Sequence, residues 1–504
     1  MKQILYFLLI ACTLFCTALN CGAQEITVSN VTVSSNLLAD TTPLNRKLAQ
    51  YRGQPVTREL LQQLLDQVTD YYHSHGYPHS QAFYPPQDSN DGNFEISLVN
   101  PTIDGVLLSY RLFLRKGTKN ALFEPLLNFH DHVDRGELHS RLRALGTLDA
   151  LRIVSGEIQQ NEAQHIYVKT HVHAAADTYF YGFADNHGSK SAGRYRMGGY
   201  LEIRNPLHMA DNLSLFAASS NELQKNFSLT YKVPVNSYAT VLGATLCYSD
   251  YDLAAEYREL GAQGHSFSSE LFIKHPYLMG EYTKGFLHWG YRYKSLVDEL
   301  KTYEVKFKKH TTAWHLGADY SYNNFPDNFS VSGSFTSGKL KVDDDWGVYE
   351  NDSYSILNAD LKVSHYFKHT PITVLNDLTW QFSPDLLDSS ERFSMGGPHA
   401  LAALDAGAAS ADTALLERFS LRYSFDSTCR LDWQLQFVQG RNNHGQSRSA
   451  RGTGLMFETI FNGLSISVSA QKLLGSSGFQ SDELQLWLSF SFTHTSGGHM
   501  TPFA

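Results

Sequence analysis

The feature that most constrains this sequence is a long succession of segments in which apolar residues alternate with small polar ones, between about Asp177 and Phe492. The last segment shows the pattern clearly, and Trp487 is the one apolar residue on its polar face. The apolar face carries Leu484, Leu486, Leu488, Phe490 and Phe492, and the other face carries Gln485, Ser489 and Ser491. Such a strand suits a bilayer, because one face meets lipid and the other meets a wet lumen. The pattern therefore predicts an outer-membrane β-barrel.

Sixteen segments carry the alternation, and bacterial barrels have even strand numbers. The expected fold class is mainly β, with a sixteen-stranded antiparallel transmembrane β-barrel over residues 177–492 and a C-terminal tail over 493–504. The expected strands are 178–185, 195–204, 212–220, 226–234, 238–249, 267–275, 284–295, 303–322, 328–342, 353–367, 372–382, 414–425, 430–439, 453–459, 463–471 and 484–492.

The start of the chain predicts a secretory signal peptide over residues 1–23. A basic beginning at Lys2 is followed by an apolar run from Ile4 to Leu14, and small residues precede Gln24. The run is too short for a membrane helix. Simple cleavage is the favoured interpretation, and lipid attachment at Cys21 remains the alternative.

Charge and cysteine content exclude some classes of protein. The net charge is −9, from 41 Lys and Arg against 50 Asp and Glu, and no basic block occurs, so we expect no nucleic-acid partner. Outside the leader, Cys247 and Cys429 lie in separate strand-like runs. Two unpaired cysteines are the favoured interpretation, and a disulfide between them in an oxidising compartment is the alternative.

Residues 24–176 predict a soluble α/β region of two small domains, 24–102 and 103–176. The first has the order strand, helix, helix, strand, strand, and its long helix is amphipathic with apolar residues at helical spacing. Its elements are a strand from Glu25, helices near 43–51 and 57–74, and strands near 80–84 and 93–99. In the second domain we expect a helix over 136–145 and a final strand over 165–173.

A motif in the first small domain resembles a known family. It consists of Gly76 and Tyr77 after the long helix, Pro86 and Gln87 before a turn, and Gly92 in that turn. The motif is similar to the first polypeptide-transport-associated (POTRA) domain of two-partner secretion transporters, the ShlB/FhaC/HecB hemolysin secretion/activation family. The resemblance implies two POTRA domains in the periplasm before a barrel in the outer membrane. In the family these domains are thought to capture an extended substrate, by strand addition to a sheet edge; a spacer domain without a ligand is the alternative.

The resemblance extends into the barrel. Asp185-Asn186 with Gly188-Ser189 is similar to the turn after the family's first barrel strand. The longest connection, from Ser383 to about Thr413, is similar to the loop that folds back into the family's lumen. Its tip motif begins with Phe393, Met395, Gly396 and Gly397.

The rest of the tip departs from the family pattern. Leu401, Ala402, Ala403 and Leu404 stand in place of Val-Arg-Gly-Tyr or Val-Arg-Gly-Phe, so the family's arginine is missing. That arginine reaches an aspartate on the lumen wall, and the corresponding stretch here is similar at Phe437, Gln439 and Gly440, with Gln439 near the aspartate's place. Loss of both partners together is physically consistent, because either one alone would be an uncompensated charge in a narrow site. We expect packing of Leu401 and Leu404 to hold the loop in the lumen; a slip in the motif alignment is the rival explanation.

No catalytic constellation is evident, so we expect no enzyme activity, no cofactor and no metal site. The sequence has no Gly-x-Ser-x-Gly, no His-Glu-x-x-His and no Gly-rich phosphate loop. His171 and His173 share one face of a strand, but solvent or core histidines are commoner there than ligands. The acidic run Asp343-Asp344-Asp345 favours a solvated loop over a Ca²⁺ site.

The leading hypothesis is a transporter in the cell outer membrane, in contact with outer-membrane lipid, that exports a large secreted polypeptide received unfolded at its POTRA domains. A barrel assembly or insertion factor, and a divergent barrel without export activity, are the alternatives. A passive porin is disfavoured by the α/β region. The family's N-terminal plug helix is expected to be absent, since strand-like sequence begins at Glu25.

Overall fold

The computed structural model describes residues 26–35, 41–75, 77, 80–87, 91–99, 103–111, 113–127, 135–160, 166–175, 177–222, 224–253, 259–343, 352–479 and 484–496. The expected signal peptide, the end of the chain from residue 497 and Gly76 lie outside these ranges. The chain divides into two compact units, one holding the first small domain and the other the second small domain with the barrel. Among the described residues, no helix combines the length and apolar character needed to cross a membrane.

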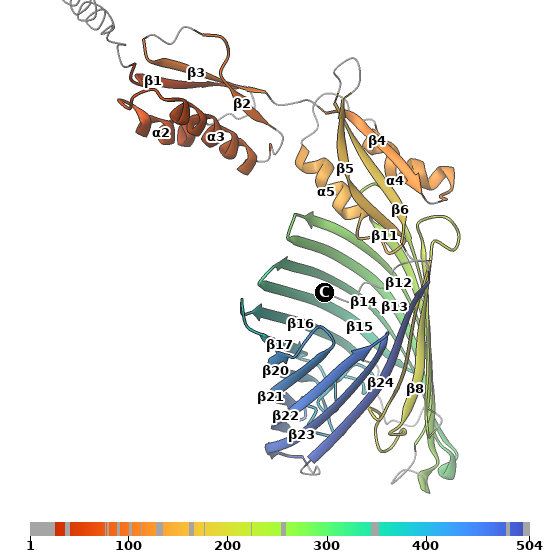
Figure 1. Cartoon of the computed structure of the whole chain (residues 1–504). Helices are drawn as coiled ribbons and strands as arrows, with labels where there is room; N and C mark the ends of the chain where they lie inside the picture. The colour runs from red at the N-terminus through yellow and green to blue at the C-terminus, as the bar shows by residue number, and fades with distance from the viewer. Residues whose placement is uncertain are drawn as a thin grey trace, which may run out of the picture. The chain divides into compact units, whose positions relative to one another are not determined.

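The first unit has the element order that the sequence predicts. Its elements are β1 (Asn30–Ser34), α2 (Thr42–Leu48), a 3₁₀ turn (Ala49–Tyr51), α3 (Arg58–Ser74), β2 (Gln81–Phe83) and β3 (Asn93–Val99). The sheet order is β1-β3-β2, with β1 parallel to β3 and β2 antiparallel to it. Both helices cover one face of this sheet (Figure 1). The buried stripe of α3, with Leu60, Leu64 and Val68, forms one core with Ile96 of β3. Thr57 caps α3 by accepting a hydrogen bond from the Leu60 amide at 3.1 Å.

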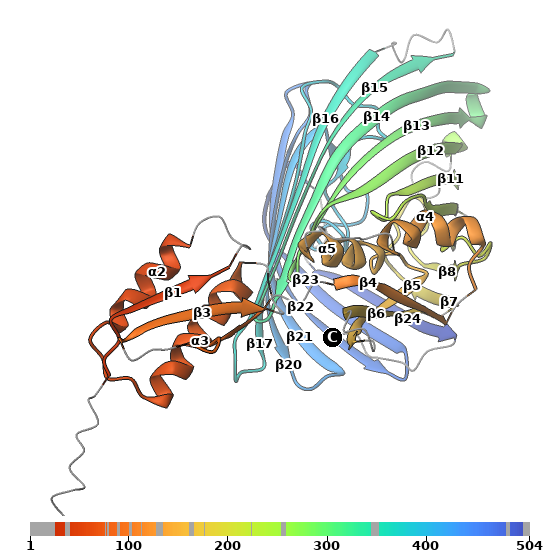
Figure 2. The same cartoon turned by 90° about the horizontal axis from the view of Figure 1, so that it is seen from above.

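The second small domain has a three-stranded sheet in the order β4-β6-β5. Its elements are β4 (Ile103–Arg111), α4 (Lys116–Leu127), α5 (Arg135–Leu145), β5 (Leu151–Gln160) and β6 (Ile166–Ala174). Figure 2 shows α4 and α5 on one side of the sheet. The sequence did not predict α4, because Gly117 in its first turn and Pro125 inside it are poor helix formers.

The barrel is closed and consists of sixteen antiparallel strands, which confirms the predicted fold (Figure 1). In barrel order from β7 the neighbours follow the chain, and β24 pairs with β7 to close the wall. The strands are β7 (Thr178–Asp185), β8 (Arg196–Arg204), β9 (Asn212–Ser220), β10 (Lys225–Pro234), β11 (Val241–Asp252), β12 (Ala262–Met279), β13 (Thr283–Leu300), β14 (Val305–Asn324), β15 (Asp327–Val342), β16 (Asp352–Tyr366), β17 (Ile372–Phe382), β20 (Thr413–Ser424), β21 (Cys429–Arg441), β22 (Ser447–Phe461), β23 (Leu464–Ser477) and β24 (Leu484–Ser496).

Several strands are longer than the alternation suggested. β12 and β13 have 18 residues each, where strands over 267–275 and 284–295 were expected, and a bilayer requires about 9–11 in a tilted strand. The lipid-facing pattern ends at the membrane boundary, so the sequence underestimates the parts that continue beyond it. The last strand likewise reaches Ser496, four residues past the expected end at Phe492.

One end of the barrel contacts the second small domain, and we call it the domain end. The side-chain amide of Asn205, in the β8–β9 turn, donates to the Phe113 carbonyl at 3.0 Å. Lys232 forms an ion pair of 2.6 Å with Asp149. The guanidinium of Arg141 lies 4.2 Å from the ring centre of Tyr238. We call the opposite end, from which residues 383–412 emerge, the loop end.

Candidate functional site

The candidate site is the connection between β17 and β20, residues 383–412, which we call the lumen loop. A short hairpin of β18 (Phe393–Ser394) and β19 (Ser410–Ala411) leads to its tip. The tip residues Met395, Leu401, Ala403 and Leu404 have at most 1% of their surface exposed. The motif that resembled the family's loop therefore lies buried inside the barrel.

Two glycines allow the tip to turn tightly. The backbone of Gly397 has a φ of +107°, which L-residues rarely adopt, and its amide donates to the Leu404 carbonyl at 3.1 Å. A Cβ on Gly396 would lie 2.3 Å from the carbonyl oxygen of Asp405. The Gly-Gly pair is therefore a steric requirement of this turn.

The barrel wall has two glycines where the tip approaches it. A Cβ on Gly440 of β21 would lie 2.6 Å from the sulfur of Met395, and one on Gly452 of β22 would lie 2.5 Å from the Cβ of Ala403. Gly440 thus contacts the loop, in the place that the sequence predicted for it. The wall is shaped to receive the tip.

Apolar packing also joins the tip to the wall. Leu401 and Leu404 belong to one buried cluster with Leu416 of β20, Val438 of β21 and Ala450 of β22. Full burial of a leucine side chain stabilises by about 1.5–3 kcal/mol relative to exposure. These two leucines therefore contribute a large share of the free energy that seats the loop.

Ala402 occupies the place of the family's arginine, and its main chain is bonded on both sides. Its amide donates to Oε1 of Gln436 on β21 at 2.7 Å. Its carbonyl accepts from Nε1 of Trp487 on β24 at 2.7 Å. Gln436 and Trp487 are both buried, with 3% of each exposed. Two neutral side chains of the wall therefore hold the peptide, in addition to the expected packing of Leu401 and Leu404, at the place of the charge pair in the family pattern.

The prediction for the wall was wrong at two positions. Gln439 is exposed and pairs across the sheet with Leu415 and Ser449, so its side chain points away from the loop. Phe437 shares that outward face because side chains two apart in a strand lie on the same side. The strand presents Gln436, Val438 and Gly440 to the loop.

Where the lumen loop leaves and rejoins the wall, one buried carboxylate organises its two arms. Asp412 is fully buried and accepts from Nε of Arg392 at 3.0 Å. It also accepts from the amides of Leu387 at 3.1 Å and Asn443 at 2.9 Å. The bonds to Arg392 and Leu387 tie the outgoing arm of the loop to its return. The carboxylate of Asp412 thus closes the base of the loop. Glu417, further along the chain on β20, lies on the outer face and accepts from Asn376 at 3.3 Å.

The outgoing arm is bound to the opposite wall by charge. Glu391 pairs with Arg292 and Lys294 of β13, both at 2.8 Å. Asp388 pairs with Lys309 of β14 at 2.5 Å, and both side chains are almost completely buried. The loop carries the acids and the wall carries the bases. This polarity is the reverse of the arginine and aspartate arrangement that the resemblance implied.

The tip is also bound to the β7–β8 connection. Lys190 pairs with Asp405 at 2.9 Å, and Arg194 lies 3.9 Å from the same carboxylate. The rings of His187 and His399 are 5.9 Å apart, and His187 is equally close to Trp487. Ser189 and Gly407 also approach closely, since a Cβ on Gly407 would lie 3.6 Å from that of Ser189.

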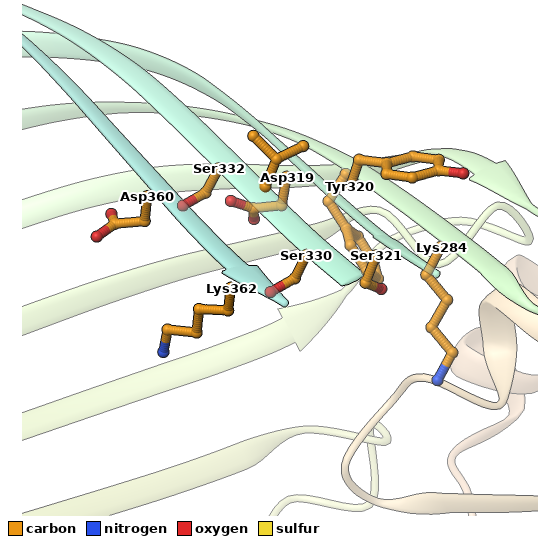
Figure 3. A pocket seen from close by; sticks show the side chains of 10 residues that line it. Lys284, Asp319, Tyr320, Ser321, Ser330, Ser332, Asp360 and Lys362 are labelled. Atoms are coloured by element: carbon orange, nitrogen blue, oxygen red, sulfur yellow. The ribbon is translucent and has the colours of Figure 1, made fainter. Parts of the chain in front are cut away.

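Two polar cavities open from the lumen on the domain-end side of the tip. One, of about 330 Å³, lies under the tip and is lined by His399, Ala402, Arg418, Asp432, Gln434 and Trp487. The other, of about 370 Å³, lies against β13–β16 (Figure 3). In Figure 3, Lys284, Ser330 and Lys362 extend from one side of the sheet and Tyr320 extends from the other. Mixed charges and hydroxyls therefore line the lumen below the loop.

The motif of the first small domain has a structural role at each described position. The Tyr77 amide donates to the Tyr72 carbonyl at 3.0 Å, and the two rings meet edge to face. A Cβ on Gly92 would lie 2.1 Å from the Thr27 carbonyl oxygen, and its φ is +73°. Pro86 is exposed beside Gln87.

The Gln87 side chain continues the sheet beyond β2. Its amide donates to the Glu95 carbonyl at 2.7 Å and accepts from the Glu95 amide at 2.7 Å. β2 stops pairing with β3 at Phe83, and the prolines that follow cannot donate a backbone bond. The side chain supplies both missing partners.

Other candidate sites are not assembled in the described part of the chain. No group of three or more His, Cys, Asp or Glu residues lies close enough there to hold a metal ion. Cys247 and Cys429 are free, on β11 and β21. His171 and His173 are neighbours, with ring centres 6.2 Å apart.

Comparison with known families decides the relationship. The family profile of the haemolysin secretion/activation protein ShlB/FhaC/HecB matches residues 165–450, and that of the ShlB-type POTRA domain matches residues 26–100. The chain belongs to the ShlB/FhaC/HecB family. It is therefore an outer-membrane transporter of the two-partner secretion type, with POTRA domains that face the periplasm. The domain end of the barrel is the periplasmic end, and the loop end is extracellular.

Relatives of this family member are divergent. The chain is 24% identical over 471 residues to the heme/hemopexin transporter protein HuxB of Haemophilus influenzae, which covers 88% of this chain and 82% of that protein. It is 24% identical over 398 residues to the outer membrane transporter CdiB of Escherichia coli, over 74% of this chain and 64% of the relative. The solved structure of CdiB from Escherichia coli has a TM-score of 0.71 at 19% identity, covering 94% of this chain and 92% of that one. CdiB from Acinetobacter baumannii has a TM-score of 0.67 at 16% identity, with 93% and 90% covered. The structural likeness is one of fold.

Proposed function

We propose that this transporter exports an unfolded secreted partner from the periplasm through the barrel, and that the lumen loop is the gate of the channel. The observation that carries the proposal is the pair of hydrogen bonds that hold the Ala402 peptide between Gln436 and Trp487. These bonds fix the loop tip to the wall without a covalent link or a buried arginine. Each neutral hydrogen bond contributes only about 1 kcal/mol, so the loop tip can leave its position on the wall and return to it.

The wall below the tip suits a hydrated chain in transit. The cavity in Figure 3 combines Lys284, Asp319, Asp360 and Lys362 with three serine hydroxyls, beside the apolar or aromatic Phe286, Tyr320 and Val331. An unfolded polypeptide meets charged and hydrogen-bonding groups of both kinds there. Since no nucleotide is available outside the inner membrane, folding of the partner at the cell surface supplies the direction of movement.

An insertion factor for other barrels is the second candidate, and the closing seam argues against it. β7 and β24 pair over eight residues each, Thr178–Asp185 with Ser489–Ser496. Asn186 extends the pairing, because its side chain donates to the Leu486 carbonyl at 2.9 Å and accepts from the Leu488 amide at 2.8 Å. Insertion requires this seam to open sideways, and the seam is as fully bonded as the neighbouring β7–β8 pair of eight residues. Export through the lumen leaves it intact.

A reversible cross-link tests the gate. The Cβ distance of 3.6 Å between Ser189 and a side chain at position 407 suits a disulfide, for which about 3.5–4.5 Å is usual. In a background with Cys247 and Cys429 changed to serine, the Ser189→Cys/Gly407→Cys variant is co-expressed with a large exoprotein encoded beside the transporter. Secreted exoprotein and the conductance of the purified pore are measured with and without an added oxidant.

We expect oxidation to stop secretion and lower conductance, and dithiothreitol to restore both. Each single-cysteine variant controls for the substitution, and Gly445→Cys controls for a cysteine at a glycine of positive φ (+87°) in another loop. Unchanged secretion with a fully formed cross-link would contradict the gate. If the transporter without the cross-link secretes no exoprotein, the export function itself is contradicted.

A further inference from the structure

The outer face of β14 and β15 carries a group of basic residues at the extracellular end. On β14, Lys309, Thr311 and Ala313 are buried toward the lumen, and Lys309 reaches the lumen loop. Because side chains alternate along a strand, the residues between them face outward. We call Lys306, Lys308, His310, Lys339 and Lys341 the outer lysine patch.

Strand pairing brings these residues together. His310 lies directly opposite Lys341, and Thr312 lies opposite Lys339. Lys308 is the diagonal neighbour of Lys341, a separation of about 7–8 Å that long side chains span. All four lysines are exposed. The patch is therefore continuous over two adjacent strands.

Aromatic residues lie next to the patch on the same outer face, toward the membrane centre. Tyr293 pairs with Thr312, which in turn pairs with Lys339. Trp314 follows two residues further along β14, and its ring meets that of Phe335 at 5.6 Å. Exposed Trp and Tyr residues of this kind mark the boundary between hydrocarbon and headgroups. The lysines accordingly lie at the level of the outer headgroups.

The charge of the patch is only partly compensated. Lys306 pairs with Glu299 at 3.1 Å and His310 with Asp343 at 2.8 Å. Lys308 lies across the strands from Asp343, whose amide donates to the Lys308 carbonyl at 2.8 Å. Within the described residues, Lys339 and Lys341 have no acidic partner. These two lysines thus present positive charge beside an apolar, aromatic surface.

We propose that the outer lysine patch binds the phosphate groups of lipids in the outer leaflet. Lysine ammonium groups donate several hydrogen bonds to phosphate oxygens and attract their charge, and the neighbouring hydrocarbon weakens solvent competition. The acyl chains of such a lipid pack against Trp314 and Phe335. A soluble anion lacks this second contact, so the lipid is the ligand that fits both halves of the surface.

The test uses the full-length protein in neutral detergent micelles containing either diphosphoryl lipid A or its dephosphorylated form. The variant Lys339→Gln/Lys341→Gln removes the two charges of the patch that have no acidic partner among the described residues. The matched control Lys284→Gln/Lys368→Gln removes two charges at the periplasmic end, from the lumen wall and a turn. Bound lipid is counted by native mass spectrometry, and the thermal midpoint is recorded with each lipid.

We expect the phosphorylated lipid to bind and to raise the midpoint of the wild type and of the control. The patch variant should bind it on the order of 25-fold more weakly, about fivefold for each lysine. Equal binding by the patch variant and the control would overturn the proposal. Equal stabilisation by inorganic phosphate alone would also overturn it, because an adventitious ion only would then explain the effect.

Discussion

The indole Nε1 of Trp487 donates a hydrogen bond of 2.7 Å to the carbonyl oxygen of Ala402, in a contact from which water is excluded. It joins the last strand of the barrel to the residue that stands where the family's arginine was expected. The loop tip is thus held through its main chain.

Removal of this donor should loosen the loop. In Trp487→Phe the ring remains but the buried Ala402 carbonyl loses its partner, which costs about 1–3 kcal/mol. We expect a higher open probability in single-channel recordings and faster proteolysis of the lumen loop. Trp433→Phe is the matched control, since the Trp433 indole donates to Thr453 on the outer face. Equal behaviour of the two variants would mean that the bond does not hold the gate.

The two glutamines of β21 should behave differently. Gln436→Leu leaves the buried Ala402 amide without an acceptor, so we expect raised conductance and a loop released by about 1–3 kcal/mol. Gln439→Leu alters only the exposed outer face and should leave conductance unchanged. Bilayer recordings of both variants measure this difference. A gating effect of Gln439→Leu would instead support the position of Gln439 on the lumen wall that the sequence predicted.

Removal of one partner of the buried ion pair in the outgoing arm should destabilise the protein more than removal of both partners. Asp388→Asn leaves the buried Lys309 with only Asp298, at 3.5 Å, as an acidic partner, so we expect destabilisation below the roughly 3–5 kcal/mol of a fully uncompensated buried charge. Chemical denaturation in detergent measures it. The double variant Asp388→Asn/Lys309→Met should recover part of the loss. Asp327→Asn, which breaks the exposed pair with His365, is the control and should change little.

Acidification should unseat the tip. Burial lowers the pKa of His187 and His399, which lie in loops outside the membrane-spanning strands. Arg196 lowers the pKa of both rings further, and Asp185 raises it. His399 also lowers the pKa of His187, and Arg418 lowers that of His399. A released loop regains the ordinary value of about 6.5. The seated state is therefore favoured above that pH and loses stability as the pH falls below it.

We expect conductance to rise between pH 7.5 and pH 5.5, and His399→Asn to flatten this response. The exposed His365 provides the control, as His365→Asn should leave the pH profile in place. A profile that His399→Asn does not alter would assign the titration to other groups.

The glycines of the tip should differ from other loop glycines. An alanine at position 396 would place Cβ 2.3 Å from the Asp405 carbonyl oxygen, so the turn must open. Gly445→Ala has no atom within 4 Å of the new Cβ and meets only the backbone cost of its positive φ, about 1–3 kcal/mol. We expect protease accessibility of the lumen loop to rise in Gly396→Ala and to stay unchanged in Gly445→Ala.

The barrel was predictable from sequence because its signal is local. One face in lipid and one in water impose a period of two on every strand, and that period is visible without knowledge of the neighbours. The loop tip was identified by resemblance to the family's tip motif at Phe393, Met395, Gly396 and Gly397, and the structure shows that the tight turn requires both glycines. The extracellular ends of β12 and β13 were missed because no lipid constrains them.

The contacts that hold the loop were not predictable in the same way. Gln436 and Ala402 are 34 residues apart, and Trp487 and Ala402 are 85 apart, so only the closed barrel brings them together. Placing Gln439 on the lumen wall was an error of register, which in a strand inverts the face of every side chain. The apolar outward residues Trp433 and Leu435 carried the correct phase. Trp487, the exception in its strand, was also a signal, because an indole on a polar face requires a local partner.

A tip held by its amide and carbonyl makes little demand on its own side chains. Substitutions at Ala402 that fit the available space retain both bonds, whereas changes at Gln436 or Trp487 remove one. Selection on gating should therefore act on the wall and permit the tip to drift between related bacteria. Among relatives of this chain, the proposed gate should therefore be traced from β21 and β24 rather than from the lumen loop.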